Sequence, residues 1–291
     1  MADRGLLASI TVETAVSRLA ATLATAGIAA ARHEARDLIA ALLDVPRFWP
    51  SVNRDAELDG ELWEQAQRAA GRRARGAPFA YAVGRAAFRH LTLDVDERVL
   101  IPRQETELLV EQVLAVAGEG GVAVDVGTGS GAIALALATE GRFDRVVATD
   151  VSLDALAVAR GNAERLAAAL RAPVEFRHGS LLAPVREVRA RVVVSNPPYI
   201  SYDEAATLPR SVRDWEPAPA LYSGAEGMAA TAEIVREAAA VLEPGGLLAL
   251  EVDMRRASLV ADRLMSDARY ADVRVRLDLT GRERFVLAAR R

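Results

Sequence analysis

The sequence contains no cysteine and no lysine, and its only histidines are His33, His90 and His178. The lack of cysteine excludes disulfides, thiolate metal sites and a cysteine nucleophile. The three histidines are scattered without the spacing of metal ligands, so we expect no metal site. With a formal net charge of -4, the chain also lacks the strong positive charge that is usual in proteins holding nucleic acid by its backbone.

Long apolar runs are absent as well. The first residues, MADRGLLASI, do not contain the apolar core of a signal peptide, and no uncharged stretch is long enough to span a membrane. We therefore expect a cytoplasmic enzyme with no membrane partner. The chain has 291 residues, of which 51% are hydrophobic and 26% charged, enough for one large domain or two modest ones with a proper core.

The first part of the chain has a helical period. Apolar residues recur on one helix face from Val12 to Leu23 and again over 35–42, and a third helix is predicted from about Leu58. Residues 76–78, Gly-Ala-Pro, are strong stop signals. From 81 to 101 the pattern changes to the alternation of a β-hairpin.

Seven strand candidates follow the hairpin, interleaved with helical segments until the last pair. Short apolar strands that alternate with helices predict a parallel sheet covered on both faces. Only residues 280–282 separate the last two strands, which is too short for a crossover helix, so these strands must be antiparallel. The expected fold is a seven-stranded, doubly wound α/β sheet with one antiparallel strand near the C-terminal edge. The expected strands are 122–127, 146–150, 174–178, 191–195, 246–252, 271–279 and 283–289. The expected domains are a helical domain at 1–77, a hairpin linker at 78–105 and a catalytic domain at 106–291.

A glycine-rich turn follows the strand at 122–127. Gly127, Gly129 and Gly131 permit tight turning and close approach of a ligand to the backbone. The next strand ends in Asp150, whose carboxylate can accept hydrogen bonds from both hydroxyls of a ribose. The spacing is neither the dinucleotide fingerprint nor a P-loop, and such a turn alone is also typical of an ordinary strand-to-helix connection. Loop and acid together indicate a nucleoside ligand, and without phosphate-binding groups S-adenosylmethionine fits better than NAD.

The stretch VVVSNPPYIS, residues 192–201, ends another strand at the ligand-binding edge of the sheet. Because Pro197 and Pro198 have no N–H, the chain must leave the ladder there. The Asn196 amide oxygen and the Pro197 carbonyl are then two acceptors for a planar NH2 group, with the ring of Tyr199 as a flat wall. A plain Pro-Pro turn explains the prolines but not their combination with asparagine and tyrosine.

The sequence closely resembles the protein N5-glutamine methyltransferases that modify peptide chain release factors. The resemblance covers nearly the whole chain, and the "IPRQETE" part of it is far more specific than Asn-Pro-Pro-Tyr, which enzymes methylating adenine and guanine share. The segments that carry it are "VLIPRQETELLV" (99–110), "DVGTGSGAIALALA" (125–138), "TDVSLDALAVARGNA" (149–163), "VVSNPPYI" (193–200), "WEPAPALYSGAEGM" (215–228) and "LEPGGLLALE" (242–251), together with Pro78, Tyr81 and Gly84.

The resemblance implies a Rossmann-like methyltransferase domain preceded by a helical domain that docks the substrate. It also implies that S-adenosylmethionine is the methyl donor, converted to S-adenosylhomocysteine, and that Thr106 closes over it. The residues expected to contact the donor are Asp125, Gly127, Thr128, Gly129, Ser130, Gly131, Asp150, Val151, Ser180, Leu181 and Asn196. The substrate glutamine is expected to lie against Asn196, Pro197, Pro198 and Tyr199. Of these, Asn196, Pro197 and Tyr199 are expected to have catalytic roles.

The expected reaction is transfer of a methyl group to the side-chain amide nitrogen, N5, of the glutamine in the Gly-Gly-Gln motif of class 1 release factors. We expect a monomer that makes no direct contact with nucleic acid. Two alternatives stay open: the same chemistry on another protein glutamine, as in a ribosomal protein, or on a nucleic-acid exocyclic amine, and a donor-binding module without turnover. Net acidity and only 5% aromatic residues disfavour nucleic acid.

The sequence does not decide the role of two segments. Arg103, Glu105 and Glu107 suit either the site or an ordinary charged helix start. After the strand that ends in Glu251, the family commonly continues with a glycine and, a little later, a glutamine, whereas this chain reads EVDMRRAS. Asp253 and Arg256 are therefore expected to place two charges beside the cleft, as neutral drift or as a sign of an altered protein partner.

Overall fold

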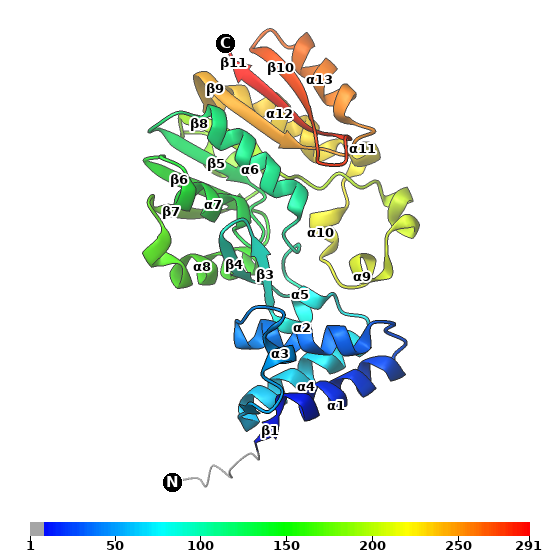
Figure 1. Cartoon of the computed structure of the whole chain (residues 1–291). Coiled ribbons are helices and arrows are strands. Elements are labelled where there is room, and N and C mark those ends of the chain that lie inside the picture. The colour runs from blue at the N-terminus through cyan, green and yellow to red at the C-terminus, as the bar shows by residue number, and fades with distance from the viewer. Residues whose placement is uncertain (1–8) are drawn as a thin grey trace. The chain divides into compact units, whose positions relative to one another are not determined.

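The computed structural model describes residues 9–291, and residues 1–8 of the expected helical domain lie outside the described residues. The chain divides into two compact units (Figure 1). Unit 1 comprises Met1–Arg85 and Arg210–Trp215, and unit 2 comprises Ala86–Pro209 and Glu216–Arg291. The expected domain borders at residues 77 and 105 stay predictions.

Unit 1 is built from short amphipathic helices around a core of aliphatic side chains. Val12, Leu19, Leu23, Leu38 and Ile39 are almost fully buried there, so the apolar stripes of the sequence face one another as the helical period predicts. The helices are α1 (Val12–Thr25), α2 (Ala31–Leu43), α3 (Trp49–Val52), α4 (Gly60–Ala74), α5 (Phe79–Val83) and α9 (Arg210–Arg213). Two short strands, β1 (Ile10–Thr11) and β2 (Glu57–Leu58), pair in antiparallel fashion.

The third helix does not begin at Leu58, as the apolar pattern suggested. Leu58 is buried in strand β2 opposite Ile10, and helix α4 begins at Gly60. Asp59 is the N-cap, and its carboxylate accepts a hydrogen bond of 2.8 Å from the backbone N–H of Leu62. The prediction was wrong because a buried apolar residue beside a cap satisfies the helical period without being helical.

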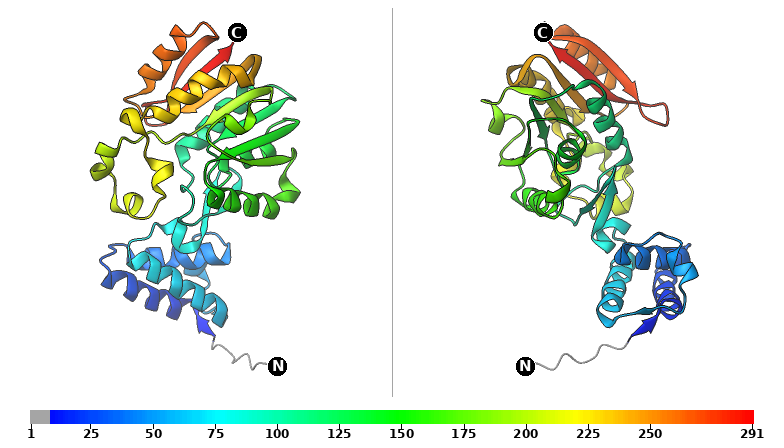
Figure 2. Two further views of the ribbon diagram at one scale, coloured as in Figure 1. Left: turned by 180° about the vertical axis from the view of Figure 1, so that it is seen from behind. Right: turned by 60° about the vertical axis from the view of Figure 1, so that its left-hand side comes forward.

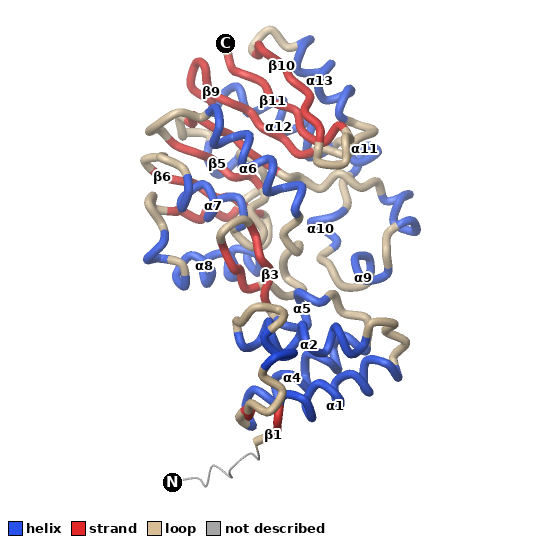
Figure 3. The backbone as a smooth tube through the Cα atoms, in the orientation of Figure 1, coloured by secondary structure: helices blue, strands red, loops and turns tan. Residues whose placement is uncertain are grey.

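Unit 2 contains the predicted seven-stranded sheet, in the order β10-β11-β9-β8-β5-β6-β7 (Figures 1 and 3). Strand β11 is antiparallel to both of its neighbours, and the pairs among the other central strands are parallel. This confirms the fold class. The strands are β5 (Val122–Val126), β6 (Arg145–Asp150), β7 (Val174–His178), β8 (Ala190–Ser195), β9 (Leu242–Glu251), β10 (Tyr270–Leu277) and β11 (Glu283–Arg290).

Strand β9 begins four residues earlier than predicted, at Leu242. The Pro-Gly-Gly sequence 244–246 is a strong turn signal, yet it lies within the strand as an irregularity in the pairing with β8. Gly245 has a φ of +79°, and a Cβ at Gly246 would approach the Ala190 carbonyl to 3.1 Å. The two glycines therefore allow a bulge that an ordinary side chain would block.

Helices cover both faces of this sheet. Helix α6 packs on α7, and α7 and α8 contact strands β5 to β7, whereas α12 and α13 pack together against β9 to β11 (Figure 2). The helices of unit 2 are α6 (Gln104–Val116), α7 (Ala132–Glu140), α8 (Leu153–Arg165), α10 (Ala218–Leu221), α11 (Gly224–Gly227), α12 (Ala229–Val241) and α13 (Ala257–Ser266), with 3-10 turns at Ala167–Ala169, Ala183–Val185 and Tyr202–Thr207. A hairpin of β3 (Arg85–Phe88) and β4 (Leu91–Asp94) precedes them.

The register of the parallel strands brings the candidate residues to one edge. Val126 of β5 lies beside Thr149 of β6 and Ser195 of β8, and Ser195 lies beside Leu250 of β9. The residues that follow, Gly127, Asp150, Asn196 and Glu251, therefore share the carboxyl edge of the sheet, where open α/β sheets bind ligands. Within residues 9–291, no helix is long and apolar enough to cross a membrane.

Candidate functional site

The glycine-rich loop is shaped by the backbone of the neighbouring strand. The N–H groups of Gly127 and Thr128 both donate to the Thr149 carbonyl at 2.9 Å, which turns the chain sharply as β5 ends. Gly127, Gly129 and Gly131 have φ values of +75°, +55° and +85°. Apart from each glycine and its chain neighbours, no atom of residues 9–291 lies within 4 Å of the place where a Cβ would stand at Gly127 or Gly129, so both leave open space in front of the backbone.

Asp125 anchors this loop from inside the sheet. One of its carboxylate oxygens, Oδ2, accepts from the Thr128 hydroxyl at 2.6 Å and from the Ala134 backbone N–H at 3.1 Å. The other, Oδ1, is buried and has no hydrogen-bond partner in the described part of the chain. Complete burial, opposed by these two hydrogen bonds, raises the pKa of Asp125 to about 7.

Asp150 joins the end of β6 to the loop. Its Oδ2 accepts from the Gly129 N–H and its Oδ1 from the Ser152 N–H, both at 2.9 Å. Each carboxylate oxygen can accept a further hydrogen bond, so this side chain can still bind hydroxyl groups. The carboxylate therefore organises the loop as well as being available to a ligand.

A cavity of about 210 Å³ lies at the carboxyl edge of the sheet. The predicted donor residues that line it are Gly127, Gly129, Asp150, Val151, Ser180, Leu181 and Asn196, together with the predicted substrate residue Pro198. The side chain of Val151 is 61% exposed, which leaves its methyl groups available to a ligand. Thr106, Asp125, Thr128, Ser130, Gly131, Pro197 and Tyr199 are not among the lining residues.

Two segments that the sequence reading did not single out for the site complete the cavity wall. They are 98–100, with Val99 buried, and 217–220, with Pro217 and Pro219 in the wall. The buried carboxylate of Glu216 holds them together, because it accepts from the Ile101 N–H at 3.2 Å and pairs with Arg103. Residues 99–100 and 217–220 belong to the motifs behind the family resemblance. The sequence therefore contained a signal for these segments, although it did not indicate that they form part of the cavity wall.

On the other side of Asn196, side chains from four segments form a connected network. The Asn196 amide nitrogen donates to the Thr106 hydroxyl at 3.1 Å, and that hydroxyl donates to Glu251 Oε2 at 2.7 Å. The Tyr199 hydroxyl donates to Glu251 Oε1 at 3.5 Å. Thr106 and Glu251 are buried, and the guanidinium of Arg284 lies 5.9 Å from the centre of the Tyr199 ring. Burial raises the pKa of Tyr199 above its ordinary range, so its hydroxyl stays a donor.

The charges after β9 are used within the fold. Arg256 is buried, and its guanidinium donates to the Glu226 carbonyl at 2.7 Å and to Glu204 at 3.0 Å. Asp253 lies 3.3 Å from the same guanidinium and 2.7 Å from that of Arg255. These contacts tie the loop after β9 to the two segments around Glu204 and Glu226. Neither Asp253 nor Arg256 lines the cavity.

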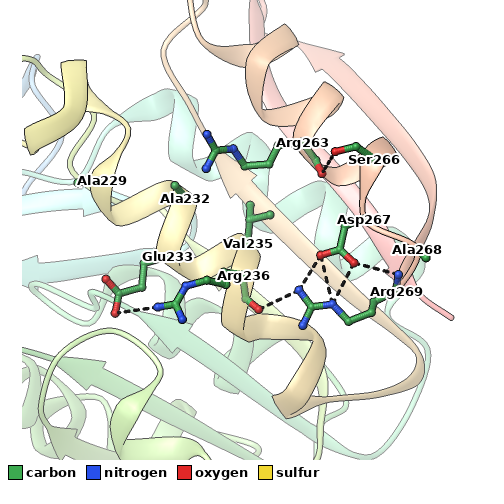
Figure 4. A pocket seen from close by; sticks show the side chains of 10 residues that line it. All are labelled: Ala229, Ala232, Glu233, Val235, Arg236, Arg263, Ser266, Asp267, Ala268 and Arg269. Carbon is green, nitrogen blue, oxygen red and sulfur yellow. Dashed lines mark hydrogen bonds and ion pairs between the residues drawn. The ribbon is translucent and has the colours of Figure 1, made fainter.

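A larger cavity, of about 680 Å³, lies at α12 and α13 (Figure 4). Arg236 in its wall contacts Glu237 at 3.2 Å, and Arg269 contacts Asp267 at 2.6 Å. These charges are paired among themselves, and none of the residues predicted for the site lies there. The smaller cavity at the strand ends is therefore the candidate site.

Comparison with known proteins agrees with this geometry. The PrmC N-terminal domain family matches residues 14–84, and the methyltransferase small domain family matches residues 103–209. The release factor glutamine methyltransferase of Moorella thermoacetica is 39% identical over 288 residues, which cover 97% of this chain and 99% of that protein. The one from Mycolicibacterium smegmatis is 41% identical over 285 residues, 96% and 98% of the two chains.

Solved structures with the same fold are more distant in sequence. A methyltransferase from Pyrococcus furiosus has a TM-score of 0.52 at 22% identity, with 68% of this chain and 87% of that chain covered. The hMettl16 catalytic domain has a TM-score of 0.53 at 15% identity, with 81% and 84% covered. The whole-length match to curated relatives and the candidate cavity at the strand ends lead to one conclusion. The chain belongs to the release factor glutamine methyltransferases, a family of S-adenosylmethionine-dependent methyltransferases.

Proposed function

We propose that the chain transfers a methyl group from S-adenosylmethionine to the side-chain amide nitrogen, N5, of the glutamine in the Gly-Gly-Gln motif of class 1 release factors, in the cytoplasm. The observation that carries the proposal is the orientation of Asn196. Because its amide nitrogen donates to Thr106, its amide oxygen is the atom left to accept a hydrogen bond from a substrate. The names of the curated relatives, which match nearly the full chain, support the same substrate.

The residues around the cavity fit the donor. Asp150 accepts from the ribose hydroxyls, the open backbone at Gly127 and Gly129 lets the donor lie close, and Val151 packs against its apolar face. Asp125 does not line the cavity, and it holds the loop in shape through Thr128 and Ala134. S-adenosylmethionine supplies a methyl group on a positively charged sulfur, which makes the methyl carbon electrophilic.

The acceptor residues compensate for a poor nucleophile. The nitrogen of a carboxamide is weakly nucleophilic because its lone pair is delocalised into the carbonyl. Asn196 Oδ1 and the Pro197 carbonyl accept its two N–H groups, which positions the nitrogen and favours pyramidalisation. Among residues 9–291, no hydrogen bond to the Pro197 carbonyl is found, so no donor of the described chain competes for that oxygen. The same acceptors stabilise the positive charge that develops on nitrogen, and the excess proton leaves once the new bond has formed.

The helical unit is proposed to bind a second surface of the release factor. A Gly-Gly-Gln loop is slim and flexible, so it suits a narrow cleft but offers little contact area for specificity. The folded factor should therefore be a much better substrate than a free peptide that contains the same loop. We propose that the enzyme acts as a monomer.

Mass spectrometry after incubation with isotopically labelled donor tests the proposal. The full-length chain should add one methyl, ~14 Da, to the glutamine of an intact class 1 release factor, and a factor with alanine at that position should stay unlabelled. A free Gly-Gly-Gln peptide should be labelled far more slowly. If a ribosomal protein or RNA were labelled in place of the factor, the enzyme would carry out the same reaction on a different substrate. Equal rates for peptide and folded factor would remove the docking role of the helical unit.

A further inference from the structure

Glu251 is the buried centre of the network on the acceptor side. It is the last residue of β9, and only 1% of its surface is exposed. Its two oxygens accept hydrogen bonds from Thr106 and Tyr199, as described above. Neither this glutamate nor Thr106 lines the donor cavity, and the mechanism proposed above assigns no role to Glu251.

The direction of the hydrogen bonds in this network follows from the charge of Glu251. An ionised carboxylate can only accept, so the single hydroxyl proton of Thr106 must point to Glu251. The lone pairs of that hydroxyl then accept from the amide nitrogen of Asn196. The orientation of an asparagine amide is set by its hydrogen-bond network, so the Asn196 oxygen is directed away from Thr106.

A neutral group at position 251 would not impose this direction. A protonated carboxyl or a glutamine amide has a donor as well as an acceptor, so it can present either one to Thr106. When it donates to Thr106, the threonine proton is free to turn to the Asn196 oxygen, and the asparagine amide rotates. Asn196 then presents N–H groups to a substrate that also presents N–H groups, and the substrate loses its acceptor.

We propose that ionised Glu251 is a positioning residue for the methyl acceptor. Through Thr106 it keeps the Asn196 oxygen facing the substrate amide, and through Tyr199 it holds the ring that forms a flat wall for that amide. The inference rests on the proposed glutamine substrate. It adds Glu251 to the machinery, as a residue that acts through Thr106 and Tyr199 without touching the reacting atoms.

The surroundings of Glu251 make its charge sensitive to pH. Burial raises the pKa of Glu251 to about 7, against the opposing influence of Thr106, Arg284 and Tyr199, while Glu105 raises it further. Below about pH 7 the group is therefore mostly protonated, and above it the group is ionised. Because the ionised form orients Asn196, turnover should rise as the pH increases through this range.

The test is the pH dependence of kcat and KM for the intact release factor, with the donor saturating. The parent chain should show an acid limb near pH 7. E251Q should turn over ~10-fold more slowly at pH 8, as expected for the loss of about one charged hydrogen bond. Its acid limb should be shallower than that of the parent because, of the two carboxyls with a pKa of about 7, only Asp125 still titrates. The control is E243Q, at the other end of the same strand, where Glu243 pairs with Arg191 at 3.1 Å; it should keep the parent profile. Donor affinity by calorimetry should be the same in all three.

A pair of variants at position 106 tests the link without changing a charge. T106V has the shape of threonine without its hydroxyl, so turnover should fall ~10-fold or more, while T106S keeps the hydroxyl and should restore most of it. If E251Q does not fold, the T106V and T106S turnover and the pH profile of the parent test the positioning role of Glu251. An acid limb in E251Q that equals that of the parent, or parent-like turnover in T106V, would overturn the inference. If the parent itself does not methylate the factor, the proposed function fails instead.

Discussion

The donor side and the acceptor side of the site are built in different ways. On the donor side, Asp125, Thr128 and Ala134 lie within ten positions of one another, and most of the contacts use backbone N–H groups. On the acceptor side, side chains of Thr106, Asn196 and Glu251 meet from segments 90 and 145 positions apart.

This difference has a chemical reason. A donor with fixed hydroxyl and ammonium groups can be held by a short loop whose shape follows from glycines and one acid. Orienting a single amide oxygen requires a partner for the amide nitrogen and a further group that orients the partner. Such a chain of partners can come only from several strands and helices. The two sides should therefore fail separately when they are mutated.

The largest effect is expected on the donor side from Asp150→Ala. It removes two predicted ribose hydrogen bonds, each typically ~1.5–3 kcal/mol for a charged acceptor, so donor affinity should fall more than ~10²-fold. Calorimetry measures this, with Asp154→Ala as the control because Asp154 is exposed on the first turn of α8 and lies outside the cavity wall. Equal donor affinity in Asp150→Ala and the parent would show that this carboxylate does not hold the ribose.

The complementary change, Asn196→Ala, should break the acceptor side. Turnover at saturating donor should fall by ~10²-fold, as for the loss of one preorganised transition-state hydrogen bond. Donor affinity should change much less, which separates it from Asp150→Ala. Single-turnover kinetics and calorimetry on the same preparation check both values. Turnover close to that of the parent would be incompatible with the positioning mechanism.

The smallest effect is expected from Val151→Ala. The change removes two methyl groups from a side chain that is 61% exposed in the cavity wall, and burial is worth ~0.8 kcal/mol per methylene-sized group. Donor affinity should therefore weaken by at most ~15-fold, with turnover at saturating donor unchanged. Val116→Ala, at a side chain that is 56% exposed on α6 outside the donor cavity, is the matched control. A similar loss of affinity in both variants would argue against contact between Val151 and the donor.

Much of the fold could be predicted from the chain. Short apolar strands that alternate with helices predicted the sheet, and the short connection at 280–282 predicted the antiparallel strand. The start of β9 could not be predicted, because Pro-Gly-Gly is a strong turn signal. Only the pairing with β8 shows that the strand already includes this sequence. Leu58 was placed in a helix because period alone does not distinguish a buried residue before a cap from the first helical residue.

The Asp253 and Arg256 pair shows the same limit at the site. From the sequence, two charges next to a cleft are equally compatible with a partner contact and with drift. In the structure Arg256 is buried and bonded to Glu204 and the Glu226 carbonyl, so its charge is satisfied within the fold. The partners of a buried arginine lie far away in sequence, and no local pattern names them.

The sequence by itself determined which residues stand at the strand ends. Gly127, Asp150, Asn196 and Glu251 reach one edge because parallel strands that are each followed by a helix all end on the same side of the sheet. Only the tertiary structure decided which way the Asn196 amide faces. That orientation depends on a proton between Thr106 and Glu251, two side chains 145 positions apart. Chain pattern governs where a residue lies, whereas the direction of a hydrogen bond depends on the groups that burial brings into contact with it.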